Sequence, residues 1–98
     1  MYLKIHETRG ERIVAICDES LIGKVLQEGK VVLDLNTYKN FYIGEKANEK
    51  EVETALTNFS SANIVGKESV ALAVKLKLVS EDNIVYIKGI PHIQIYRL

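Results

Sequence analysis

The chain has 98 residues, of which 47% are hydrophobic and 27% are charged, and its 13 basic residues balance 13 acidic ones. This length supports one domain, residues 1–98, with too much apolar content for a disordered chain. The zero net charge argues against non-specific binding to duplex nucleic acid, which requires an excess of cations. A single cysteine excludes an internal disulfide. With no leader sequence and no apolar run of about 20 residues, the chain is expected to be cytoplasmic and to have no membrane contact.

The N-terminal segment predicts a β-hairpin. Residues 2–7 and 12–17 alternate as strands do, and Gly10 between them can adopt the positive φ of a tight turn. A two-residue loop of Arg9 and Gly10 would pair Glu7 with Arg12, Ile5 with Val14 and Leu3 with Ile16. The opposite face would then carry Tyr2, Lys4 and His6.

The next segments predict a short helix, a strand and a loop. Asp18 could cap a helix over residues 19–27, although Gly23 weakens it and Gly29 would end it. Residues 31–35 (VVLDL) favour a third strand, and residues 37–47 a loop or a short edge strand.

Residues 48–59 predict the clearest helix. Asn48 is a suitable N-cap, and acidic residues follow it in the first turn, where the helix dipole favours them. The apolar residues Val52, Leu56 and Phe59 form one stripe along the helix. We therefore expect this helix to lie on the sheet.

Two readings compete for residues 61–69 (SANIVGKES). In the first, Gly66 ends one helical turn and Lys67 begins the next helix, whose free amides and lysine would hold a phosphate. In the second, the segment is a common corner between two helices in which Asn63 bonds to the backbone. Residues 70–79 are ambiguous, because apolar side chains alternate as in a strand while the residue types favour a helix.

The last part of the chain predicts a second hairpin from residues 84–88 and 93–98. A loop of odd length at Gly89, Ile90 and Pro91 would place Tyr86 and Lys88 on the same face as His92, Gln94 and Tyr96. Together with Lys4 and His6, they would form a sheet face in which aromatic rings alternate with donors and cations. Such faces bind single-stranded RNA by stacking and base-edge hydrogen bonds, but a solvated sheet face has the same composition.

Cys17, His6 and His92 are the candidate nucleophile, base or metal ligands. In the predicted register His6 and Cys17 lie about 13 Å apart along the strands, too far for a hydrogen bond. The three residues also lack the spacing of a zinc site. We therefore expect no catalytic residue, metal or cofactor, and we expect Cys17 to be a packed thiol.

Three segments carry a family resemblance: CDESLIGK (17–24), ANIVGKESVALA (62–73) and GIPHIQ (89–94). Over nearly its full length the chain resembles an archaeal family known as domain of unknown function 424. The resemblance implies a small cytoplasmic domain with no assigned enzyme activity, described as a predicted RNA-binding protein. Members of the family often have a glycine at the position of Lys77. A glycine there suits the end of a helix, so the resemblance favours a helix over residues 67–77. The matching positions are Cys17, Asp18, Gly23, Lys24, Ala62, Asn63, Val65, Gly66, Gly89, Pro91, His92 and Gln94.

The sequence therefore predicts an α+β fold: a single, mostly antiparallel sheet of N- and C-terminal hairpins plus a middle strand, with two or three helices packed on one face. The first hypothesis for function is a non-enzymatic RNA-binding or translation-associated module whose partners are RNA or ribosome-associated proteins. The alternatives are a protein–protein adaptor or homodimer, and a small-molecule or phosphate-ligand enzyme with His92 as base. The candidate nucleic-acid-binding residues are Lys4, His6, Asn63, Gly66, Lys67, Tyr86, Lys88, His92, Gln94 and Tyr96.

Overall fold

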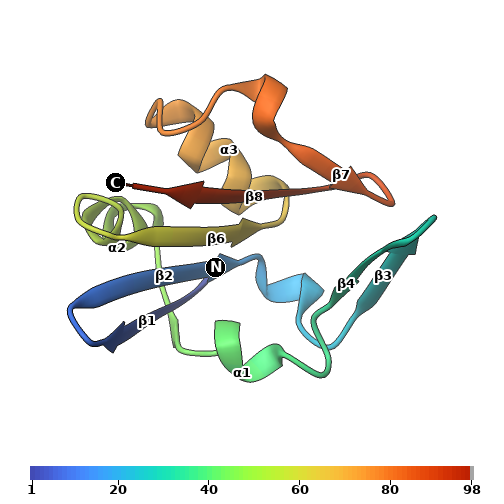
Figure 1. The fold of residues 1–98 in the computed structure, drawn as a ribbon, viewed down its shortest axis with the longest axis horizontal. Coiled ribbons are helices and arrows are strands. Elements are labelled where there is room, and N and C mark those ends of the chain that lie inside the picture. Colours follow the sequence, from blue (N-terminus) through green and yellow to red (C-terminus); the bar gives the residue numbers. More distant parts are fainter. Residues whose placement is uncertain (98) are drawn as a thin grey trace.

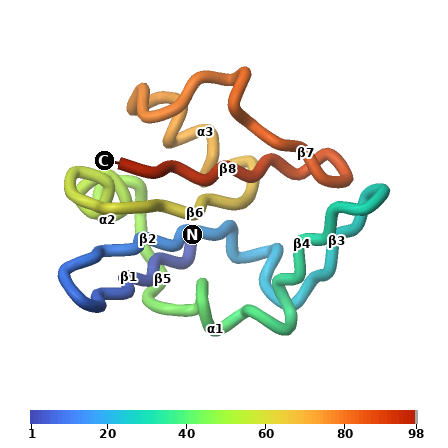
Figure 2. The backbone as a smooth tube through the Cα atoms, viewed as in Figure 1, coloured from blue at the N-terminus to red at the C-terminus, as the bar shows by residue number. Residues whose placement is uncertain are grey.

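The computed structural model describes residues 1–97 and confirms the α+β class, with 3 helices and 8 strands (Figures 1 and 2). Leu98, the last residue of the expected domain, lies outside the described residues. The elements in chain order are β1 (Tyr2–Thr8), β2 (Glu11–Cys17), a 3₁₀ turn (Glu19–Leu21), β3 (Val25–Glu28), β4 (Val31–Asp34), α1 (Lys39–Tyr42), β5 (Glu45–Lys46), α2 (Glu49–Ala55), β6 (Ser61–Val65), α3 (Lys67–Lys75), a second 3₁₀ turn (Glu81–Asn83), β7 (Val85–Ile87) and β8 (Ile90–Tyr96).

Six strands form the main sheet in the order β5-β1-β2-β6-β8-β7, and β3 pairs with β4 in a separate two-stranded sheet. Within the main sheet every neighbouring pair is antiparallel except β2 and β6, which are parallel. The two terminal hairpins therefore lie in one sheet, as predicted, and β6 joins them. Figure 1 shows the β3–β4 hairpin projecting away from this sheet.

The register of the first hairpin agrees with the prediction at all three expected pairs. The turn residues Arg9 and Gly10 both have positive φ, 50° and 79°, which suits a two-residue hairpin turn whose twist matches that of the strands. On one side of the sheet Arg12 Nη1 donates to Glu7 Oε1 over 2.7 Å. Alternation along β1 and the two-residue turn were therefore sufficient to fix this register.

The second hairpin forms with a different turn from the one expected. Lys88 and Gly89 have φ values of 53° and 77° and make a two-residue turn, so Ile87 pairs with Ile90 and Tyr86 pairs with Pro91. The expected loop of odd length is wrong. Because opposite residues in an antiparallel pair share a face, Tyr86 lies on the opposite face from His92.

The predicted helix over residues 19–27 is also wrong. Only one 3₁₀ turn forms, and β3 follows it. The Asp18 side chain makes no capping bond to this turn. Gly23 has a φ of 92°, and its amide donates to Leu35 O over 2.8 Å, which joins the base of the β3–β4 hairpin. Long-range pairing with β4 thus replaces the local helix, and the expected strand over 31–35 forms as β4, outside the main sheet.

Residues 61–65 form the parallel strand β6, so the expected helical turn before Gly66 and the helix–helix corner are wrong. Ala62 and Ile64 are buried on one face of the sheet between β2 and β8. A helix does begin at Lys67, as predicted, and it ends where Lys77 adopts a φ of 59°. The ambiguous segment 70–79 is therefore helical at its start, and Lys77 takes the left-handed conformation that a helix end often uses.

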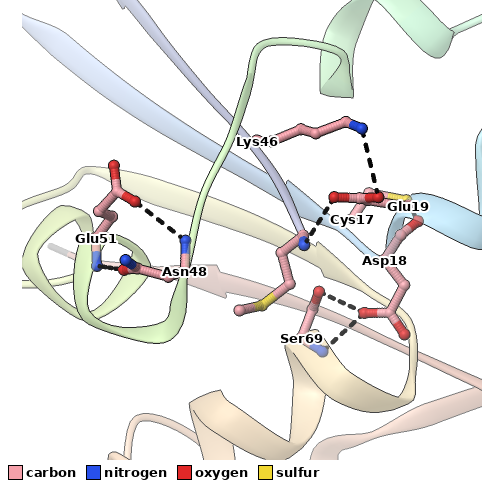
Figure 3. A network of polar contacts seen from close by, with 8 residues as sticks. Cys17, Asp18, Glu19, Lys46, Asn48, Glu51 and Ser69 are labelled. Carbon is pink, nitrogen blue, oxygen red and sulfur yellow. Dashed lines mark hydrogen bonds and ion pairs between the residues drawn. The ribbon is translucent and has the colours of Figure 1, made fainter.

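The helix predicted over residues 48–59 forms as α2, but it ends at Ala55 with Leu56 as its C-cap, so Phe59 lies beyond the helix. Asn48 Oδ1 accepts from the Glu51 amide over 2.9 Å, and Glu51 Oε1 accepts from the Asn48 amide over 3.2 Å, so the pair makes a capping box (Figure 3). The stripe of Val52, Leu56 and Phe59 is buried. This helix could be predicted because its cap and its stripe are local features.

Two apolar clusters lie on the two faces of the main sheet. The larger one packs α2 and α3 against Ile16 of β2, Ile64 of β6 and Ile93 of β8. The smaller one, on the other face, packs Leu35 and Tyr42 against Ala15, Cys17 and Val65. Helices α2 and α3 therefore cover one face, while β4 and α1 cover part of the other. No helix within residues 1–97 has the length and apolarity needed to cross a membrane.

Asp18 connects the end of β2 to the start of α3 (Figure 3). Its carboxylate accepts from the amides of Glu68 and Ser69 over 3.0 and 2.8 Å and from Ser69 Oγ over 2.6 Å. A Cβ atom at Gly66, whose φ is 110°, would clash with this carboxylate. Two amides in the first turn of α3 are therefore bonded to an internal anion, and the protein itself occupies the phosphate site of the first reading.

Replacing Asp18 with alanine should lower the free energy of unfolding by about 2 kcal/mol, because it removes the cap of α3 and leaves the buried Ser69 hydroxyl without its acceptor. Urea unfolding followed by circular dichroism measures this change. The control is Asp82→Ala, at an exposed carboxylate, where a change below about 0.5 kcal/mol is expected. Equal effects of the two substitutions would contradict the capping role.

Candidate nucleic-acid interface

One face of the main sheet carries most of the predicted binding residues. The pairings place Asn63 of β6 opposite Gln94 of β8, and Ala15 of β2 between Asn63 and Lys4 of β1. In the same way His92 lies opposite Val65. Side chains directly opposite share a face, so residues from both terminal hairpins meet on this side of the sheet.

A cleft of about 630 Å³ opens on this face. The main sheet contributes Asn63, His92 and Gln94 to its lining, and β4 with α1 and the residue before it contribute Val32, Asp34, Tyr38 and Phe41. The size lies within the range of about 300–1,000 Å³ that is usual for small-ligand sites. The structure thus brings three predicted residues, Asn63, His92 and Gln94, together on one wall of the cleft. Residues of β4 and α1 form the second wall.

The floor of the cleft holds an amide pair. Gln94 Nε2 donates to Asn63 Oδ1 over 3.0 Å. Within residues 1–97 no further hydrogen bond occupies Asn63 Nδ2 or Gln94 Oε1. Because each amide orients the other, Asn63 Nδ2, the second N–H of Gln94 Nε2 and the acceptor Gln94 Oε1 remain for a ligand in this cleft.

Asp34 lies at the end of β4 in the opposite wall. Its Oδ1 accepts from the amides of Asn36 and Thr37 over 3.0 and 2.8 Å, and the bond from Thr37 is the main reason that its pKa is lowered. The carboxylate is therefore ionised at neutral pH. Among residues 1–97, those that line the cleft include no lysine and no arginine, so the cleft favours a neutral or donor-rich ligand over an anion.

The aromatic wall comes from α1 and the residue before it. Tyr38 is 65% exposed, which leaves its ring accessible for stacking. Phe41 stacks on His6, with ring centroids 4.6 Å apart and planes at 11°, and it meets Tyr42 edge to face at 5.1 Å. Contacts with His6 and Tyr42 therefore hold the Phe41 ring in place.

Lys4 and His6 share this face of the sheet but hold α1 instead of lining the cleft. Lys4 Nζ donates to Asn40 O over 2.6 Å. His6 Nε2 lies 2.9 Å from Phe41 O, and because a carbonyl only accepts, this nitrogen carries the proton and donates. These two predicted residues therefore position the aromatic wall.

The other predicted residues lie elsewhere. Tyr96 is exposed opposite Ser61, outside the cleft, and Lys88 is exposed in the β7–β8 turn. Tyr86 and Lys67 line a separate groove of about 390 Å³ between α3 and β7 with β8, and Gly66 is buried against Asp18. The predicted set therefore divides between the two faces of the sheet.

His92 is half-buried in the cleft, and this burial lowers the pKa of its imidazole below 6.5. The ring is therefore neutral at pH 7 and offers one donor and one acceptor. A concave site around His92, which the enzyme alternative requires, does exist.

Cys17 is fully buried, and desolvation raises the pKa of its thiol to about 12, so it remains protonated at neutral pH. This agrees with the expected packed thiol. Among residues 1–97, no three His, Cys, Asp or Glu side chains gather closely enough to hold a metal ion.

Sequence reasoning missed the second wall of the cleft, which contains Asp34, Tyr38 and Phe41. Residues 37–47 were expected to be a loop or a short edge strand. The short edge strand does form, as β5, but Lys39–Tyr42 form α1, which was not predicted. The aromatic residues at positions 38, 41 and 42 follow the spacing of one helical turn, which was the available signal. Their position over the sheet depends on contacts with β1 and β2 that no local pattern contains.

Comparison with known proteins supports the resemblance seen in the sequence. The model of a family described as "Protein of unknown function (DUF424)" matches residues 6–98. The chain belongs to the DUF424 family. A crystal structure of an uncharacterized conserved protein from Methanopyrus kandleri is similar, with 28% identity and a TM-score of 0.79, over 97% of this chain and 89% of that one. No curated protein sequence matches this DUF424 chain.

The three segments that carry the DUF424 resemblance meet at one end of the main sheet. Cys17 pairs with Val65, which in turn pairs with His92. The Gly66 amide donates to Pro91 O over 2.9 Å, and the Asp18 amide donates to Val65 O over 3.1 Å. Residues far apart in this DUF424 sequence therefore support one region next to the cleft.

The lowered pKa of His92 should make the stability of this DUF424 protein depend on pH. The unfolded chain binds a proton at a higher pH than the folded chain, so the free energy of unfolding is highest above about pH 6.5 and falls as the pH drops towards the folded pKa. In His92→Gln the decrease between about pH 7 and about pH 5 should be smaller. Urea unfolding at a series of pH values measures it, and the same pH dependence in both proteins would exclude this role of burial.

Proposed function

We propose that this chain is a non-enzymatic module that binds single-stranded RNA and takes one unstacked base into the cleft on the sheet face. The observation that carries this proposal is the meeting of an accessible aromatic ring, Tyr38, with the amide pair of Asn63 and Gln94 around one cleft. Sequence-specific recognition of RNA uses these two kinds of contact: stacking on rings and hydrogen bonds to base edges.

The geometry separates the two kinds of contact. The floor offers a donor at Asn63 Nδ2 and an acceptor at Gln94 Oε1, which matches a base edge with neighbouring donor and acceptor groups. Tyr38 and Phe41 belong to the other wall, where the face of a base would stack. A planar base between these walls would use both of its chemical surfaces.

The charges favour contact with bases over contact with phosphates. The net charge is +0, Lys4 already bonds to α1, and Asp34 lines the cleft. The exposed Lys39, next to Tyr38, and the exposed Lys88 remain for the RNA backbone. With so few phosphate contacts, affinity should depend only modestly on salt and should come mainly from the base in the cleft.

The enzyme alternative has less support than RNA binding. His92 is neutral and lines the cleft, but within residues 1–97 no side chain makes a hydrogen bond that would orient its ring. The cysteine is buried and protonated. A general base usually acts beside a nucleophile or an orienting carboxylate, and the cleft supplies binding groups without that arrangement.

Two exposed tyrosines provide a matched test of RNA binding. Tyr38→Ala should weaken the binding of labelled single-stranded RNA by about fivefold to about 150-fold, because a stacked base contributes about 1–3 kcal/mol. Tyr86→Ala removes a ring that is also exposed, at 55%, but on the opposite face, and should leave the affinity unchanged. Fluorescence anisotropy at low salt measures both, and cosedimentation with ribosomal fractions extends the assay to a translation-associated target.

Two results would contradict the proposal. The first is no binding by the unmodified chain at low salt. The second is equal loss of affinity in the two tyrosine variants, which would mean that the cleft does not determine binding.

A protein partner is a second candidate function, favoured by the exposed aliphatic side chains near the cleft. Val25, Val31, Val32 and Val85 are each 50–54% exposed on β3, β4 and β7. Clusters of exposed apolar side chains often mark protein–protein contacts. If this surface joins two copies of the chain, light scattering should show a dimer that Val32→Asp dissociates. A monomer at high concentration would exclude the homodimer.

A further inference from the structure

Asp34 places a carboxylate in the cleft, and among residues 1–97 no lysine or arginine lines the cleft beside it. Asp34 Oδ1 accepts from the amides of Asn36 and Thr37, and a side-chain hydrogen bond from Thr37 also helps to lower the pKa of this carboxylate, so it remains an anion in the cleft. Beside it, the amide pair offers Gln94 Oε1 as an acceptor and Asn63 Nδ2 with the second N–H of Gln94 Nε2 as donors. A ligand that fits these groups places an N–H donor against the carboxylate and presents both a donor and an acceptor to the amide pair.

We propose, on the basis of the RNA-binding function above, that the cleft selects a base with an exocyclic amino group and discriminates against uracil. Adenine and cytosine each carry an amino group with two N–H bonds next to a ring nitrogen that accepts. Uracil has one N–H between two carbonyl oxygens. If that N–H bonds to the Asp34 carboxylate, a flanking carbonyl oxygen lies close to the carboxylate, and two acceptors cannot bond to each other.

The amide pair distinguishes a base from the other planar donor, the guanidinium group of an arginine on a partner protein. A guanidinium has five N–H donors and no acceptor. It would bond well to Asp34 but would leave Asn63 Nδ2 unpaired, and it occupies little of a cleft of about 630 Å³. The mixed floor and the size of the cleft therefore favour a base.

Asp34 is the residue that determines this selectivity. Its position at the end of β4 is fixed by the bonds from Asn36 and Thr37, which an asparagine oxygen could also accept. Asp34→Asn therefore keeps the turn while it exchanges an acceptor for an NH₂ donor in the cleft. The variant should accept the carbonyl oxygen of uracil, so the selectivity should decrease while folding is preserved.

The test compares labelled oligonucleotides of about six nucleotides, all adenine, all cytosine or all uracil, in anisotropy titrations with the full chain. The unmodified protein should bind the adenine and cytosine oligonucleotides at least about tenfold more tightly than the uracil one, within the discrimination of a good edge contact. In Asp34→Asn the ratio should fall to about twofold or less. Asp82→Asn, at an exposed carboxylate outside the cleft, should keep the original ratio.

The outcomes separate this inference from the function on which it rests. Equal affinity for all three oligonucleotides, with loss of affinity in Tyr38→Ala, would retain RNA binding and overturn the base selectivity. A preference that Asp34→Asn does not change would also overturn it. If no oligonucleotide binds while N-acetylarginine amide does, both the RNA-binding function and the base selectivity fail, and the cleft belongs to a protein partner.

Discussion

The rest of the structure depends on the parallel pairing of β2 with β6. It inserts β6 between the two terminal hairpins and so makes one continuous sheet from both ends of the chain. Parallel neighbours require a crossover, and the crossover here carries the β3–β4 hairpin, α1 and α2 around the sheet. The same pairing brings the end of β2 to the start of α3, where Asp18 caps the helix. The pairing of β2 with β6 therefore joins the two hairpins into one sheet and places the start of α3 beside Asp18.

The candidate site follows from how that crossover covers the sheet. One face is covered by α2 and α3, whereas β4 and α1 cover only part of the other. Lys4 and His6 bond to α1 and help to hold it, and the uncovered remainder exposes Asn63, Gln94 and part of His92. The polar side chains on this face of the sheet therefore have two roles. Lys4 and His6 hold α1, whereas Asn63, His92 and Gln94 line the cleft.

The charges of the molecule make the cleft a poor site for phosphate groups. The anion site suggested by the start of α3 is satisfied internally by Asp18, and the cleft itself contains a carboxylate and a neutral imidazole. With a net charge of +0, the chain offers little attraction to phosphate as a whole. Aromatic rings and uncharged base edges are complementary to such a site, which is why the proposals concern a base and not the RNA backbone.

The sequence by itself determined what depends on near neighbours: the alternation and register of the first hairpin and the capped start of α2. The helix that follows Gly66 was left ambiguous by the residues and was favoured only by the family resemblance. The sequence also indicated Asn63, His92 and Gln94, which the structure places in one cleft. Only the tertiary structure decided the partner of Asp18, the strand at residues 61–65 and the position of the Tyr38 wall, because long-range hydrogen bonds and packing replaced the local preferences of those segments. It also decided the face of Tyr86, since a change of one residue in turn length reverses every side chain along the strand.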